Sequence, residues 1–103
     1  MKKADVFVEG NLAGTLTELE RGKNYVFSYA EGYEAQPVSL TMPTDKREYR
    51  FEAFPSFFDG VLPEGVMLEA LLKQEKIDRN DFFRQLTTVG EDLVGAVSVK
   101  EKA

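Results

Sequence analysis

The chain has no cysteine, no histidine and no tryptophan among its 103 residues. Without cysteine it can form neither a disulfide framework nor a thiolate metal site. Without histidine it lacks both the commonest general base and the commonest nitrogen ligand for zinc. These absences exclude most familiar hydrolase and metalloenzyme mechanisms. We therefore expect a protein that is not an enzyme and that has no catalytic residues, no metal site and no cofactor.

Basic residues are in the minority, since 13 Lys and Arg stand against 18 Asp and Glu and leave a net charge of −5. Non-specific binding to a phosphate backbone needs a concentrated positive surface. No window approaches the ~18 consecutive apolar residues that a membrane span needs, and residues 1–5 run directly into a strand pattern without an apolar signal region. We expect a cytoplasmic protein that contacts neither nucleic acid directly nor a membrane.

The length predicts a single domain over residues 1–103, large enough to bury roughly 60–70% of the surface of its unfolded chain. The sequence shows no internal repeat, linker or low-complexity segment. Met1 and the charged tail 100–103 favour a complete small protein.

The first half of the chain alternates apolar and polar residues with a period of two. Residues 4–9 and 12–16 flank a turn at Gly10-Asn11, which predicts a hairpin. A second turn at 21–24 leads into a strand with three aromatic residues on one face, Tyr25, Phe27 and Tyr29. Short strands are also predicted at 38–42 and 47–52.

The second half changes to a helical period. Pro63 suits a first helical turn, and an apolar stripe then continues to about Lys76: Met67, Leu68, Leu71 and Leu72. Asp78 is predicted to cap a second helix, which Gly90 ends, and residues 93–99 are predicted as a last strand. The predicted fold class is α+β, with a small antiparallel barrel-like β-sheet and two or three helices in the second half.

The same periodicities select candidate core residues on the inner faces of these elements. They are Val6, Val8, Leu16, Phe27, Leu40, Phe51, Leu71, Phe82, Leu86 and Val97.

Three features could carry chemistry, and each has a structural alternative that we prefer. The aromatic stripe could stack bases, but in an acidic chain a core face is the better interpretation. Gly90 and Gly95 could frame a phosphate loop, but the G-x-G-x-x-G and P-loop patterns are absent. The carboxylates could work as acid–base pairs, yet exposed acidic residues are ordinary in such a domain; they are Asp59, Glu64, Glu91 and Asp92.

Residues 54–72 hold more apolar side chains than a short turn and a three-turn helix can bury. An exposed apolar patch on a small domain usually marks an interface. The alternative is a thick core beneath the sheet, and the sequence leaves both interpretations open.

Three ordered motifs carry a family resemblance: Pro-Val-Ser-Leu-Thr-Met-Pro at 37–43, Phe-Phe-Asp-Gly-Val-Leu-Pro-Glu at 57–64 and Val-Gly-Glu-Asp-Leu-Val-Gly-Ala-Val at 89–97. Together with the hairpin at 10–16 they closely resemble the amino-terminal subdomain of HipA-type serine/threonine kinase toxins. The resemblance covers essentially the whole chain. In full-length members a kinase core follows this subdomain, and no such catalytic apparatus is present in these 103 residues.

A free-standing copy of the subdomain resembles HipS, the small member of the three-component HipBST toxin–antitoxin systems. The resemblance implies a non-catalytic antitoxin that binds a HipT-like kinase core in trans and neutralises it. It also implies a HipB-like helix-turn-helix DNA-binding protein in a ternary complex. The alternatives are an amino-terminal scaffolding subdomain of a HipA-type kinase toxin, or a small ligand-binding module.

The segment around the Pro-Glu-Gly turn is the expected contact with the kinase. It has surplus apolar residues, and the free amides of the helix start could meet an acidic or phosphorylated loop. Some relatives carry a tryptophan directly after this turn, where Val66-Met67 stands here. The candidate partner-binding residues are Phe57, Phe58, Leu62, Pro63, Glu64, Gly65, Val66 and Met67.

Overall fold

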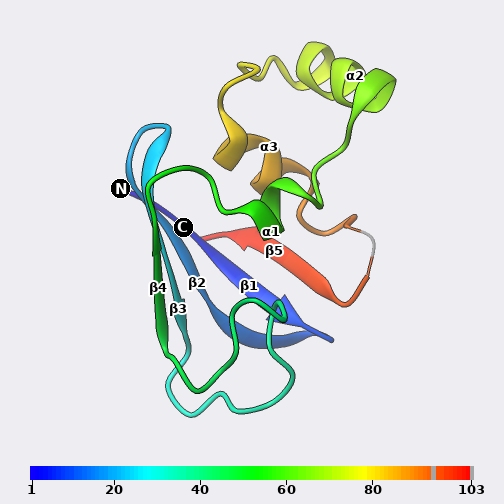
Figure 1. Cartoon of the computed structure of the whole chain (residues 1–103). Helices are drawn as coiled ribbons and strands as arrows, with labels where there is room; N and C mark the ends of the chain where they lie inside the picture. The colour runs from blue at the N-terminus through cyan, green and yellow to red at the C-terminus, as the bar shows by residue number, and fades with distance from the viewer. Residues whose placement is uncertain (94, 103) are drawn as a thin grey trace.

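The structure is a computed structural model that describes residues 1–93 and 95–102. It contains a five-stranded antiparallel sheet of order β4-β3-β2-β1-β5 and three helices in the second half (Figure 1). The strands are β1 Lys2–Val8, β2 Asn11–Glu20, β3 Lys23–Tyr29, β4 Glu48–Phe51 and β5 Val97–Glu101; the helices are α1 Ser56–Asp59, α2 Gly65–Glu75 and α3 Phe82–Val89. The predicted α+β class is confirmed.

The sheet is open, however, and does not close into the barrel that the prediction suggested. Across the residues that the structure describes, β4 pairs with β3 and β5 pairs with β1, so that these two strands form opposite edges. Helices α1 and α3 bury one face of the sheet instead, with Phe58, Phe83 and Leu86 fully enclosed in the shared core. Because helices cover that face, the core needs no barrel closure.

The aromatic stripe of β3 belongs to the core, which confirms the structural interpretation. Tyr25, Phe27 and Tyr29 are all buried. Among the ten core candidates, Val6, Val8, Leu16, Phe27 and Leu86 are buried, while Phe51, Leu71, Phe82 and Val97 are half-buried. Leu40 was wrongly placed in the core, since its side chain is 94% exposed.

Residues 38–42 form an irregular segment and not the predicted strand. The Tyr29 hydroxyl donates to the Met42 carbonyl and accepts from the Val38 amide (3.0 Å). Within the segment the Ser39 hydroxyl accepts from the Thr41 amide at 3.2 Å, and at the base of the wider loop Arg47 donates to the Ala30 carbonyl at 2.6 Å. Side chains therefore satisfy backbone groups of the segment that a strand would pair with a neighbour. Leu40 points outward because the segment is held at Val38 and Met42 on either side of it.

Local turn chemistry corrects two further predictions. The β1–β2 turn is Glu9-Gly10 and not Gly10-Asn11, because both central residues have positive φ (51° and 80°), as a type I′ turn requires. The α3 cap is Asp81, whose side chain accepts from the Arg84 amide at 3.1 Å. Asp78 accepts from the Asn80 amide in the preceding turn instead.

The other helix and strand bounds differ slightly from the prediction. Helix α2 begins at Gly65, after Pro63, and ends before Lys76, which adopts a left-handed conformation with φ of 55°. Strand β5 starts at Val97 and not at residue 93; the part of that prediction on Val94 lies outside the described residues. Within the described chain, no helix has the length and apolar content to cross a membrane.

Candidate partner-binding site

The eight candidate residues divide between the core and the surface. Phe58 is fully buried and Leu62 is 8% exposed, so both pack beneath the sheet. Val66 and Met67 are 85% and 72% exposed. Phe57 and Pro63 are half-buried, and Glu64 and Gly65 are exposed. One part of the segment is therefore core, and the other is exposed apolar surface.

The Pro63-Glu64-Gly65 turn separates these two parts. Glu64 caps α2 in an extended conformation (φ −129°, ψ 164°) and makes no side-chain capping bond. Gly65 has a positive φ of 57°, a conformation that side chains disfavour. The chain thus leaves the core at Leu62, turns over three residues and presents Val66 and Met67 at the start of a helix.

Helix α2 has no buried residue, although half of the eight candidate residues lie in or next to its first turn. Leu68, Leu71 and Leu72 are half-buried, whereas Val66 and Ala70 lie one turn apart on the exposed side. Figure 1 shows α2 at the periphery of the molecule, well away from the sheet. The helix therefore offers apolar surface that its own fold leaves largely uncovered.

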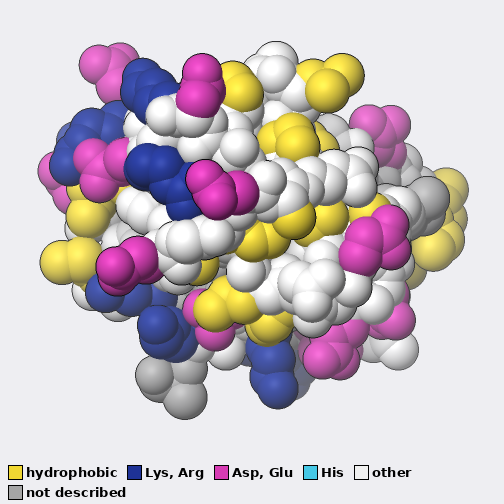
Figure 2. Space-filling view, turned by 90° about the horizontal axis from the view of Figure 1, so that it is seen from below, with side chains coloured by type: hydrophobic (Ala, Val, Ile, Leu, Met, Phe, Trp, Pro, Cys, Tyr) yellow, Lys and Arg dark blue, Asp and Glu magenta, His cyan; other side chains and the backbone are white. Residues whose placement is uncertain are grey.

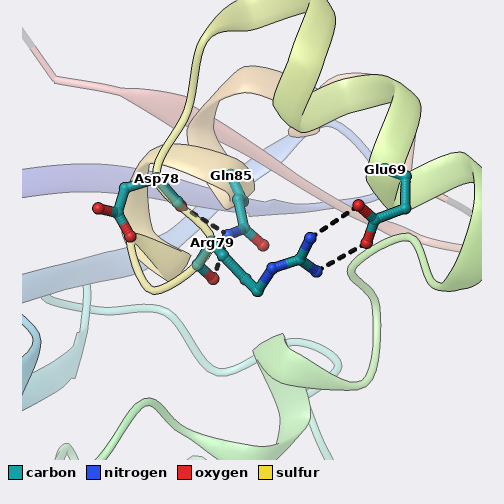
Figure 3. A network of polar contacts seen from close by, with 4 residues as sticks. All are labelled: Glu69, Asp78, Arg79 and Gln85. Atoms are coloured by element: carbon teal, nitrogen blue, oxygen red, sulfur yellow. Dashed lines mark hydrogen bonds and ion pairs between the residues drawn. The ribbon is translucent and has the colours of Figure 1, made fainter.

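A polar network holds α2 beside the turn that precedes α3 (Figure 3). Both terminal nitrogens of Arg79 donate to the Glu69 carboxylate at 2.7 Å, and this bidentate pairing lowers the pKa of Glu69. Gln85 is 1% exposed and donates to the carbonyls of Asp78 (3.2 Å) and Arg79 (3.0 Å). Because the Glu69–Arg79 ion pair is exposed, it contributes little to the stability of the fold and mainly fixes the orientation of α2.

A groove of about 510 Å³ lies beneath the start of α2. Its walls come from the turn before α2 and from the end of α3 with the residues that follow it. Two carboxylate residues border it, Glu64 and Asp92. The remaining lining is apolar apart from one glycine: Gly60, Val61, Leu62, Pro63, Met67, Val89 and Leu93.

The groove unites two motifs that are separate in the sequence, the one around Pro63 and the one after Val89. Four of the eight candidate residues line it: Leu62, Pro63, Glu64 and Met67. Phe57 lines a different hollow of about 410 Å³ with residues 36–40.

Sequence reasoning missed the contribution of Val89, Asp92 and Leu93 to this site. The second motif was visible in the sequence, but its position beside Pro63 was not. Gln85 was also missed, although a polar residue among the apolar positions of α3 is a usable signal for a buried hydrogen bond. Among the described residues, no group of three or more acidic side chains could hold a metal ion.

The fold and the groove define a small α+β domain with an open sheet and a largely unburied helix at one end. The sequence matches the HipA N-terminal domain family over residues 4–100. The chain therefore belongs to this family, as its motifs indicated.

Two related proteins and one solved structure illustrate the family. A protein of Haemophilus influenzae named only "Uncharacterized protein" is 31% identical over 99% of this chain and 94% of its own length. A protein of Sinorhizobium fredii named "Putative kinase Y4dM" is 32% identical over 92% of this chain but only 25% of its own length. A solved structure of the N-terminal domain of HipA toxin is 28% identical, with a TM-score of 0.80 over all of this chain and 94% of that one.

Proposed function

We propose that this protein binds a HipT-like, HipA-family kinase core in trans and neutralises it as an antitoxin. The observation that carries the proposal is the exposure of Val66 (85%) and Met67 (72%) at the start of α2, in a domain of the HipA family. Large apolar side chains that gather on an exposed element of a small domain usually contact another protein. The groove under the same helix start extends this apolar surface.

The proposed role is non-enzymatic. Phosphoryl transfer relies on a loop that covers the phosphates, a residue that orients the nucleophile and a metal-binding aspartate. The match to the Sinorhizobium protein covers a quarter of that protein, so any activity of its remaining length does not carry over to this chain. The Haemophilus relative supports a free-standing domain, because the alignment spans 94% of that protein.

The proposal includes a cytoplasmic location and a ternary complex with a HipB-like helix-turn-helix protein. The DNA contact falls to that partner, since the chain itself has a net charge of −5. No contact of this chain with nucleic acid or with a membrane is proposed.

Two other functions each have one observation in their favour. The match to a quarter of a longer protein that is named as a putative kinase favours an amino-terminal scaffolding subdomain. The groove volume of about 510 Å³ falls in the usual range of small-ligand sites and favours a ligand-binding module. A neighbouring reading frame for a kinase core without this subdomain distinguishes the trans-acting antitoxin from both.

The test is titration calorimetry of this protein against such a kinase core, together with rescue of growth when the two are co-expressed. Val66→Asp and Met67→Asp each place an unpaired charge in the contact, which costs roughly 2–5 kcal/mol and weakens binding by one to several orders of magnitude. The melting temperature is expected to change little, because both side chains are exposed in the free protein.

Leu40→Asp is the matched control, since Leu40 is apolar and even more exposed (94%) but belongs to the other hollow. This variant is expected to bind like the wild type. The proposal fails if the wild type neither binds nor rescues. If both aspartate variants bind normally, the contact does not involve the start of α2.

A further inference from the structure

The excess negative charge of the chain comes from two stretches of sequence. Residues 51–72 and 85–99 contain no Lys or Arg. They contain six acidic residues: Glu52, Asp59, Glu64, Glu69, Glu91 and Asp92. The rest of the chain has 13 basic residues against 12 acidic ones and is nearly neutral.

The groove is built from these two stretches alone. The first supplies its residues from Gly60 to Met67, and the second supplies Val89, Asp92 and Leu93. Among the residues that the structure describes, no Lys or Arg lines it, and the ion pairs involve Glu20, Glu48 and Glu69 instead. Glu64 and Asp92 are both exposed, so they face the solvent over an apolar floor.

Charged side chains are also spread unevenly over another face of the molecule, which Figure 2 shows from below. The dark-blue Lys and Arg side chains gather toward its left and lower middle, and the charged side chains toward its right-hand edge are acidic. Fixed charges of one sign around a cleft attract the opposite sign and raise its association rate.

We propose that this groove receives a segment of the kinase core in which a Lys or Arg stands beside apolar side chains. The inference rests on the proposed function and names the chemistry of the partner at that same site. The apolar side chains of the segment enter between Met67 and Leu93, and its cation lies between the Glu64 and Asp92 carboxylates. The two carboxylates repel an acidic or phosphorylated loop. The structure therefore favours a positively charged kinase segment, whereas the helix start alone would favour a negatively charged one.

Charge reversal tests the inference. The double variant Glu64→Lys/Asp92→Lys is titrated against the kinase core at low and at high ionic strength. We expect the dissociation constant to rise at least about tenfold at low salt, and the difference from wild type to shrink as salt screens the charges. The control, Glu31→Lys/Glu34→Lys, makes the same charge change at two exposed acidic residues outside the groove and is expected to have little effect.

Site-directed cross-linking identifies the occupant directly. Because the chain has no cysteine, Met67→Cys supplies one thiol for a benzophenone label, attached before the kinase is added. After irradiation, mass spectrometry is expected to find a kinase peptide that contains a Lys or Arg next to apolar residues. Leu40→Cys, labelled in the same way, is the control and is expected not to yield this peptide.

The outcomes separate this inference from the function on which it rests. If the wild type does not bind the kinase, the proposed function is overturned and the inference falls with it. If the wild type binds but charge reversal leaves the dissociation constant unchanged at low salt, the inference alone is overturned. Cross-links to an acidic kinase segment overturn it too. So does a wild-type dimer that is lost in the double variant, because the groove would then bind a second copy of this chain.

Discussion

At the scale of single residues, Gly90 shows how closely α3 and β5 approach. A Cβ at this position would lie 2.0 Å from the Val99 carbonyl oxygen, and the Val99 amide donates to the Gly90 carbonyl at 2.9 Å. The φ of Gly90 is −56°, so the position needs glycine for space and not for backbone conformation. Gly90, the second residue of the motif at 89–97, therefore lets the end of α3 pack directly against the last strand.

Gly90→Ala is expected to destabilise the protein by at least about 1–3 kcal/mol, because backbone atoms must move to admit the methyl group. Gly60→Ala is the matched control: its φ is −67° and its Cβ would meet backbone oxygens only at 3.4 Å. That variant is expected to be near neutral. Urea unfolding of the two variants measures the difference, and equal stabilities would contradict the close packing.

Tyr25 makes the free energy of unfolding depend on pH in the alkaline range. Burial first, and then its hydrogen bond to the buried Glu18 carboxylate (3.1 Å), raise the pKa of the Tyr25 hydroxyl above its ordinary value. An unfolded tyrosine ionises near pH ~10, so above that pH the unfolded chain releases a proton that the folded chain retains. The contribution to stability is complete below pH ~10 and is lost as the pH rises toward the folded pKa.

Tyr25→Phe is expected to reduce the loss of stability between about pH 9.5 and 11 without abolishing it, because burial also raises the pKa of Tyr29. At neutral pH the variant is expected to lose about 1–3 kcal/mol, since Glu18 then keeps, among the described residues, only the Gly22 amide as a donor (3.3 Å). Urea unfolding across this pH range provides the measurement. Parallel losses for wild type and variant would contradict the assignment to Tyr25.

At the scale of secondary-structure elements, α2 and α3 differ in how they are held. Helix α3 buries Phe83, Gln85 and Leu86, whereas α2 buries nothing and depends on half-buried leucines and the Glu69–Arg79 pair. An element with few buried apolar contacts opens locally at a free energy below that of global unfolding. Such a helix can adjust its position on a partner while the sheet and α3 stay intact.

Hydrogen exchange is expected to show this difference: the amides of α2 exchange faster than those of α3, whose protection approaches the global stability. In the same way, Leu72→Ala is expected to cost about 1 kcal/mol, and Leu86→Ala about 2–5 kcal/mol, because only Leu86 is fully buried. Equal protection of the two helices would show that α2 is part of the same cooperative unit.

At the scale of the whole molecule, the packed sheet and the excess negative charge lie in different regions. One face of the sheet is closed by α1 and α3, and its two edge strands carry charged side chains, Glu48 and Arg50 on β4 and Lys100 and Glu101 on β5. Charged edges discourage strand-to-strand association. The excess negative charge lies instead in the stretches that line the groove. Contact with the proposed partner is therefore expected at the groove and α2 and not at the sheet edges.

The sequence by itself determined the α+β class, the strand periodicity around Phe27, the two longer helices and the family, because these depend on local pattern and on the order of motifs. It could not place the ends of elements such as α3, where Asp78 and Asp81 are both good caps and only the packing of Phe83 and Gln85 selects between them. Nor could it show that Leu40 is exposed, since a loop held by Tyr29 and Arg47 has no periodic signal.

The candidate site divides in the same way. Local pattern identified the Pro63 turn and its surplus of apolar residues, but buried Phe58 and exposed Met67 have the same apolar character in sequence. The tertiary structure separated them, because burial depends on which elements pack over a residue and not on the residue itself. It also placed Asp92 and Glu64 at the border of one groove, since residues so distant in the chain come near each other only when α3 and β5 pack on the sheet.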